Sequence, residues 1–235
     1  MLPQPVDDGQ TKGPEGQPGH GALVPMSAVE LESRFTTFQR LTVRQRKRWF
    51  ELLLNFELKN SYDVYDDQQM PVFRVREQGN GLAAFLKRIF LGPFRPFRAL
   101  VTDLGTDAPV MAVARPFRFI FHRLEISSAD GEHLGAIQRR WSWLRRIYVI
   151  EDAQGQVVAD IFGPILRPWT FEVRIDGQPQ AVIRKRWSGL LKEAFTDADN
   201  FGVDIGALPS ARLKALVFAA TVLIDVVHFE RSKNR

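Results

Sequence analysis

The stretch that decides the fold is ARLKALVFAATVLIDVVHF, residues 211–229, near the C-terminus. It carries no charge between residues 215 and 224, and Pro209 and Ser210 directly before it are typical of a helix start. A helix that is apolar on every side lies either inside a protein or inside a bilayer. A spanning helix needs about 20 mostly apolar residues, whereas Lys214, Asp225 and His228 interrupt this run. We therefore predict a helix buried in a protein core. The alternative is a single membrane span through residues 211–229.

The residues before this helix indicate what would bury it. From residue 60 onward, apolar residues alternate with polar ones at the strand period, and polar turns separate these runs at uneven intervals. Asp-Gly between alternating runs is a strong hairpin signal. Five successive hairpins are predicted, with turns near residues 67, 104, 130, 153 and 176. A closed antiparallel barrel of about a dozen strands is wide enough to hold a helix in its lumen.

Length and composition limit the remaining possibilities. The 235 residues suit one large domain or two small ones. We predict a disordered, Pro- and Gly-rich tail over residues 1–30 and one barrel domain over residues 31–235. The net charge of +5 favours anionic lipid, nucleic acid or an acidic protein as a partner. The absence of cysteine excludes disulfides, thiolate metal sites and S-palmitoylation. The first residues do not resemble a secretory signal, which predicts the cytoplasm or the cytoplasmic face of a membrane.

Two segments are candidates for lipid contact. Residues 81–91 place Phe85, Ile89 and Phe90 on one helical face, with Lys87 and Arg88 off it. This segment is either a lid helix packed on the barrel or an interfacial helix lying in a bilayer surface.

The second segment contains two tryptophans between two arginine pairs. It consists of Arg139, Arg140, Trp141, Trp143, Arg145 and Arg146 with Ser142 and Leu144. The rings suit the headgroup level of a bilayer and the cations suit phosphates. The same residues could cap the barrel end, or stack on bases and contact a nucleic-acid backbone. We rank lipid first, the structural role second and nucleic acid third.

Catalytic chemistry is not indicated. The four histidines show no metal-binding spacing, and no phosphate loop, dinucleotide fingerprint or nucleophile with a base stands out. We therefore expect that the protein is not an enzyme.

The stretch IRKRWSGLLKEAFTDADNFG, residues 183–202, strongly resembles the signature of the phospholipid scramblase family. Residues 223–225, Leu-Ile-Asp, resemble the family's C-terminal helix, and a second similarity runs from Glu51 to Glu77. The resemblance covers roughly residues 40–230. It implies a tubby-like fold, mainly β, with about twelve strands around a central hydrophobic helix. It also implies a membrane-associated protein that moves phospholipids between leaflets without ATP, in response to calcium.

The chain departs from the family pattern in two ways. Many members carry palmitoylated cysteine clusters, whereas this chain has apolar side chains at those places, which we interpret as encoded anchors. The family's proposed calcium loop begins here with Asp197, Asp199 and Asn200, but its twelfth position is Leu208, not an acidic residue. A calcium loop depends on its terminal carboxylate. Calcium is therefore expected to bind weakly at best, and a polar turn leading into a strand is an equal interpretation.

The leading hypothesis is a scramblase-like protein on an anionic phospholipid membrane. Its four arginines at 139, 140, 145 and 146 would bind lipid, and Phe85, Ile89 and Phe90 would insert shallowly. The alternative is a soluble tubby-like binding module that docks on phosphoinositide, protein or nucleic acid without moving lipid.

Overall fold

The computed structural model describes residues 24–45, 61–78, 97–116, 123–142, 146–164, 166–167, 169–186 and 200–224. Within them a short helix comes first, twelve strands follow, and a second helix ends the described chain. The elements are α1 (Ala28–Thr36), β1 (Arg40–Gln45), β2 (Ser61–Tyr65), β3 (Pro71–Glu77), β4 (Phe97–Asp103), β5 (Pro109–Arg115), β6 (Arg123–Ser128), β7 (His133–Arg140), β8 (Arg146–Asp152), β9 (Val157–Gly163), β10 (Thr170–Ile175), β11 (Gln178–Arg186), β12 (Asn200–Asp204) and α4 (Ala211–Ile224).

The twelve strands form one closed antiparallel barrel in which each strand pairs with its neighbours in sequence. All five predicted hairpins are present, as β2–β3, β4–β5, β6–β7, β8–β9 and β10–β11. The barrel closes where β1 pairs with β12, with Leu41 opposite Val203 and Val43 opposite Phe201. The closed barrel predicted from the sequence is therefore confirmed.

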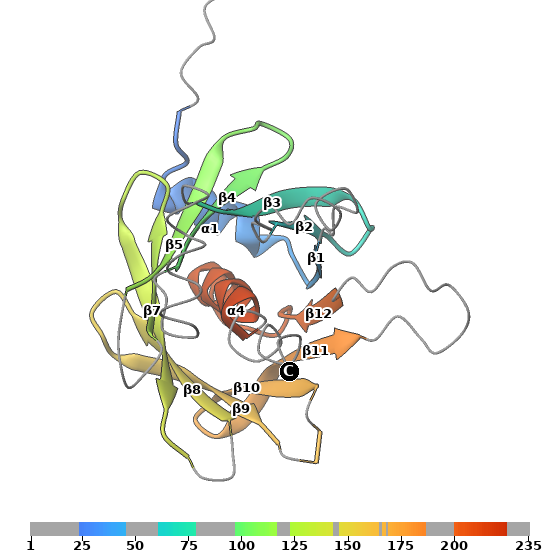
Figure 1. Cartoon of the computed structure of the whole chain (residues 1–235), viewed down its shortest axis with the longest axis vertical. Coiled ribbons are helices and arrows are strands. Elements are labelled where there is room, and N and C mark those ends of the chain that lie inside the picture. The colour runs from blue at the N-terminus through green and yellow to red at the C-terminus, as the bar shows by residue number, and fades with distance from the viewer. Residues whose placement is uncertain are drawn as a thin grey trace, which may run out of the picture.

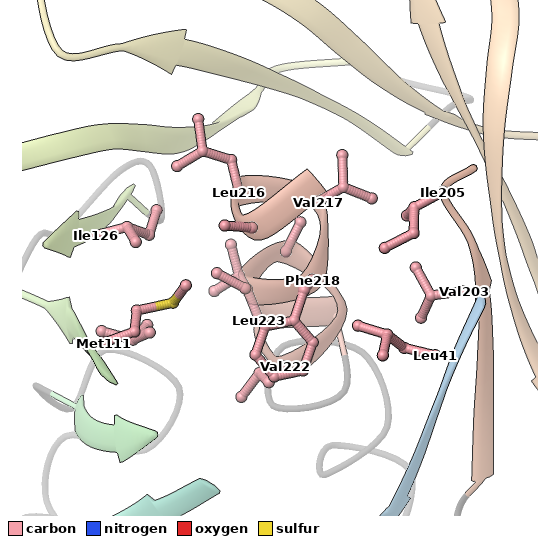
Figure 2. Close-up of a cluster of buried hydrophobic side chains, with 14 of the residues drawn as sticks. Leu41, Met111, Ile126, Val203, Ile205, Leu216, Val217, Phe218, Val222 and Leu223 are labelled. Carbon is pink, nitrogen blue, oxygen red and sulfur yellow. The ribbon is translucent and has the colours of Figure 1, made fainter. Parts of the chain in front are cut away.

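Helix α4 occupies the lumen of the barrel (Figure 1). Every residue from Leu213 to Ile224 is buried. Met111 and Ile126 approach the helix from one side, and Leu41, Val203 and Ile205 approach it from the other (Figure 2). The prediction of a core helix is thus confirmed over residues 211–224, while residues 225–229 of the predicted helix lie outside the described residues. In the described part of the chain, no helix has both the length and the apolar character needed to cross a bilayer.

Because neighbouring strands are antiparallel, the loops that join them alternate between the two ends of the barrel, and the loops at the two ends differ. One end carries the tight turns of the five hairpins, and we call it the turn end. At the other end, which we call the connection end, the chain passes from β1 to β2, β3 to β4, β5 to β6, β7 to β8, β9 to β10 and β11 to β12.

Helix α1 covers the turn end. It begins at Ala28, so its first turn overlaps the range predicted as tail, of which residues 1–23 lie outside the described residues. Ser27 and Glu30 form a capping box, which satisfies N–H groups of the first turn. The ring of Phe35 lies 5.5 Å from that of Phe73 and 5.8 Å from that of Phe218 on α4. Since α4 starts beside α1, it runs from the turn end toward the connection end.

Candidate functional site

The described part of the predicted Arg–Trp segment lies at the connection end, where β7 finishes. Arg139 is paired with Tyr148, which is fully buried, so Arg139 lies on the inward face of the barrel. Arg140 lies on the outward face and is exposed. Trp141 follows directly, with 67% of its surface exposed. An exposed guanidinium and an exposed indole therefore stand side by side in the sequence at this rim.

Arg146 faces the interior of the barrel. Its guanidinium carbon lies 4.6 Å from the centre of the Phe171 ring, and that ring is buried. Gly163, paired with Arg146, leaves room for this contact: a Cβ there would meet Phe171 at 3.0 Å and the Cβ of Arg146 at 3.2 Å. Partial burial lowers the pKa of Arg146 from its ordinary value, but an arginine remains charged at neutral pH. Arg146 thus combines a packing contact with a positive charge at the mouth of the barrel.

The two inward-facing arginines differ from Arg140 in their surroundings. Helix α4 points its C-terminal end toward the connection end, and a helix carries a partial negative charge at that end. Arg139 and Arg146 place positive charge on the same side of the barrel interior. The exposed side chains, Arg140 and Trp141, are therefore the better candidates for contact with a ligand.

Sequence reasoning missed the connection between β9 and β10. Here Leu166 is 94% exposed, Arg167 is exposed and Trp169 is 37% exposed. The backbone N–H of Lys185 donates to the carbonyl of Trp169 over 2.9 Å, and the Lys185 Nζ lies 5.6 Å from the centre of the Trp169 ring. The signal was present in the sequence Pro164-Ile-Leu-Arg-Pro-Trp169, which places apolar residues in a connection bounded by prolines.

Several predicted site residues lie outside the described residues, namely Phe85, Lys87, Arg88, Ile89, Phe90, Trp143, Arg145, Asp197 and Asp199. The strands that flank them still place their points of attachment. The chain leaves β3 at Glu77 and enters β4 at Phe97, and it leaves β11 at Arg186 and enters β12 at Asn200. All of these points are at the connection end, so the three predicted segments are attached to the same end of the barrel.

Of the three predicted calcium ligands, Asn200 is described. It is the first residue of β12, and it is paired with Arg44 on β1 and Arg186 on β11. Leu208 is buried in the core. Among the described residues, no group of three or more histidine, aspartate or glutamate side chains is placed to hold a metal ion.

Charge is divided between the two ends of the barrel. Described basic side chains gather at the connection end, where Glu77 also lies: Arg98, Arg139, Arg140, Arg146, Arg167 and Lys185. Described acidic side chains gather at the turn end, where Arg34, Arg40 and Arg212 also lie: Asp66, Asp67, Asp107, Asp130, Glu132, Asp152 and Asp176. The connection end therefore combines positive charge with exposed Trp141 and Leu166, a combination that suits an anionic surface with an apolar layer beneath it.

Comparison with known proteins identifies the family. The model of the scramblase family matches residues 21–231. Human phospholipid scramblase 2 is 28% identical over 235 residues, covering 94% of this chain and 77% of that protein. Mouse phospholipid scramblase 1 is 29% identical over 210 residues, covering 83% of this chain and 62% of that protein. Human phospholipid scramblase 4 is 30% identical over 200 residues, covering 77% of this chain and 58% of that protein. No solved structure matches the chain. Because the family model covers most of its length, the chain belongs to the scramblase family.

Proposed function

We propose that this protein is a phospholipid scramblase, which moves phospholipids between the leaflets of a membrane without ATP. In this proposal it is a lipid translocator, not an enzyme, and it acts from the cytoplasmic face. The observation that carries the proposal is the basic connection end with exposed Trp141, in a chain that belongs to a family whose relatives are named phospholipid scramblases.

The physical task of a scramblase is to lower the cost of taking a polar headgroup through hydrocarbon. An unpaired charge or polar group in an apolar medium costs several kcal/mol or more. Exposed cations such as Arg140 and Arg167 would hold the barrel on anionic headgroups, at about 1 kcal/mol for each cation near the surface. Trp141 would lie at the headgroup level, where its ring separates neighbouring lipids. The residues proposed to insert into the bilayer are still Phe85, Ile89 and Phe90. They belong to a segment that is attached to the connection end of the barrel.

Transport is tested in vesicles that carry a fluorescent phospholipid in both leaflets. Dithionite destroys the outer label at once, so an active protein exposes the inner label and an inactive one leaves it protected. We expect the wild-type chain to expose the inner label. A label that stays protected with and without calcium would refute lipid transport and leave only a binding module with this fold.

Binding is tested separately by co-sedimentation with vesicles that contain phosphatidylserine. Arg140→Gln and Arg167→Gln are each expected to weaken binding about fivefold at low salt, because each removes about 1 kcal/mol of attraction. Added salt should shrink both differences. Arg40→Gln is the matched control, since it removes one exposed arginine at the turn end, where Arg40 is paired with Asp204. A loss in the control as large as in the two variants would show that net charge, not the connection end, governs binding.

A further inference from the structure

We propose that the barrel docks on an anionic bilayer with its connection end toward the lipid, and that Leu166 enters the interfacial layer beside Trp141. The turn end, with α1, then faces water. That the binding partner is a membrane rests on the proposed function. The orientation and the role of the β9–β10 connection go beyond it.

Leu166 lies in the connection that joins β9 to β10, and we call its position the tip. The backbone N–H of Arg167 donates to the carbonyl of Pro164 over 3.2 Å, and that of Thr170 donates to the carbonyl of Arg167 over 3.1 Å. Leu166 is 94% exposed at this tip. A leucine gains free energy when it leaves water, and the hydrogen bond between Arg167 and Pro164 spans this one.

Residues beside the tip suit the headgroup level. Trp169 is partly exposed, and the Lys185 Nζ lies near its ring and 5.7 Å from the centre of the Phe201 ring. An indole and a lysine are both favoured at the boundary between hydrocarbon and water. Arg167 follows Leu166 directly and is exposed, so a cation accompanies the apolar tip.

The β9–β10 tip is a neighbour of the rim that carries Trp141. Arg146, where the chain enters β8, is paired with Gly163, where it leaves β9. The β7–β8 and β9–β10 connections therefore start from adjacent positions on the same end of the barrel. Trp141 and Leu166, both largely exposed, lie in these two adjacent connections.

Exposed apolar residues also occur at the turn end, so exposure alone does not fix the orientation. Met70 is 58% exposed and Val157 is 52% exposed. Met70 follows Asp66 and Asp67 in the same turn, and Val157 is paired across the hairpin with Glu151, next to Asp152. Carboxylates are repelled by an anionic surface, whereas the arginines near Leu166 are attracted to it. Charge therefore selects the connection end.

The absence of cysteine makes the orientation directly measurable. Leu166→Cys and Val157→Cys give two full-length chains, each with one exposed thiol, at opposite ends of the barrel. Each is labelled with an environment-sensitive fluorophore and mixed with vesicles of phosphatidylcholine, with and without phosphatidylserine. We expect the label at 166 to shift to the blue and brighten severalfold on the phosphatidylserine vesicles, and the label at 157 to keep its spectrum in water.

A charge variant tests the same inference without a label. Leu166→Glu is expected to weaken co-sedimentation roughly tenfold or more, because it removes an inserted side chain and adds a repelled charge. Val157→Glu adds the same charge at the turn end and should bind like wild type. Circular dichroism is expected to show both variants folded, since both positions are exposed.

Three results would overturn the inference: a spectral shift at 157 and not at 166, equal shifts at both positions, or no shift at 166, whether or not the chain binds the vesicles. Lipid transfer by the unlabelled wild-type chain is measured in parallel. Transfer without a shift at 166 would overturn this orientation and leave the proposed function intact. A shift at 166 without any transfer would refute scrambling and support the docked orientation.

Discussion

The Nζ of Lys214, near the start of α4, donates a hydrogen bond of 2.8 Å to the carbonyl oxygen of Phe38, just beyond the end of α1. The same nitrogen donates to the carbonyl of Thr36 over 3.1 Å, and the lysine is 5% exposed. Carbonyls at a helix C-terminus lack partners within the helix and carry partial negative charge. In the sequence, Lys214 interrupts an apolar run. In the fold, it fastens the lumen helix to the helix that covers the turn end.

Lys214→Met should destabilise the protein. The change keeps most of the side-chain volume but leaves the buried carbonyl of Phe38 and the partly buried carbonyl of Thr36 without this donor, at a cost of about 1–3 kcal/mol. Denaturant unfolding measures the difference. Arg212→Met is the control, because Arg212 is paired with Glu32 and Glu132 at the surface, where such pairs contribute about 0–1 kcal/mol. Equal stability of Lys214→Met and wild type would contradict the role given to this lysine.

Among the described glycines, Gly135 on β7 is the one at which an added Cβ would meet a side chain of α4. Its φ is +154°, and a Cβ there would meet the carbonyl oxygen of Glu151 at 2.3 Å and Leu216 at 3.1 Å. Gly135→Ala should therefore cost about 3 kcal/mol or more, since backbone and core must both shift. Gly131→Ala tests backbone strain alone, because Gly131 has a φ of +102° and no atom within 4 Å of the added Cβ. Its cost should be about 1–2 kcal/mol. Similar melting temperatures for the two variants would contradict the close approach.

Val222, in the last described turn of the lumen helix, is 1% exposed. Val222→Asp should unfold the whole barrel, because an unpaired buried charge costs several kcal/mol against a total stability of about 5–15 kcal/mol. Val222→Ala removes volume without adding charge and should lower stability by only about 2 kcal/mol. A folded Val222→Asp chain, with wild-type near-ultraviolet circular dichroism, would show that the lumen tolerates charge.

The hairpins could be predicted because each one is encoded locally. Asp176 and Gly177 have φ values of 50° and 77°, as a tight hairpin turn requires, and these are residue types that adopt positive φ. The lumen helix was predictable because its apolar run admits few other environments. Strands β1 and β12 were not predicted as a pair, since they are short and lie far apart in sequence. In β1 only Leu41 and Val43 are buried, and Arg40 and Arg44 beside them are typical of a solvated segment, not of a core strand.

The candidate site was less predictable than the fold. Whether Arg146 faces the lumen or the solvent depends on strand register, because a shift by one residue exchanges the two faces. Its contact with Phe171 crosses from β8 to β10, and no local pattern encodes that contact. The exposed Leu166 could not be distinguished from a buried leucine, because its exposure depends on how the connection lies relative to the rest of the barrel.

Stability should depend on pH through the cap of α1. The carboxylate of Glu30 accepts hydrogen bonds from the backbone N–H and the hydroxyl of Ser27, both over 2.8 Å, and these bonds lower the pKa of Glu30 below its ordinary value. A depressed carboxyl pKa stabilises the fold above the unfolded pKa, and this contribution is lost as the pH falls through the lowered folded value. In Ser27→Ala, NMR titration should show the pKa of Glu30 moving up toward the ordinary range. The gap in unfolding free energy between wild type and Ser27→Ala should also narrow as the solution is acidified below that range. If this difference in unfolding free energy did not change with pH, the stabilisation would come from the Ser27 cap alone and not from the charge of Glu30.

Calcium binding is expected to be in the millimolar range or absent. Calcium needs six to eight oxygen ligands, and a twelve-residue loop depends on the carboxylate at its last position, which here is the buried Leu208. Residues 200–204 form a strand paired on both sides, and the carboxylate of Asp204 already accepts from Arg40 over 2.5 Å and from Arg184 over 3.2 Å. Titration calorimetry on the full chain measures the affinity. Arg40→Gln combined with Arg184→Gln releases Asp204 from both arginines, and it should leave the titration unchanged if Asp204 is not a ligand. Micromolar affinity in wild type that disappears in Asp197→Ala would show that the loop binds calcium without its terminal carboxylate.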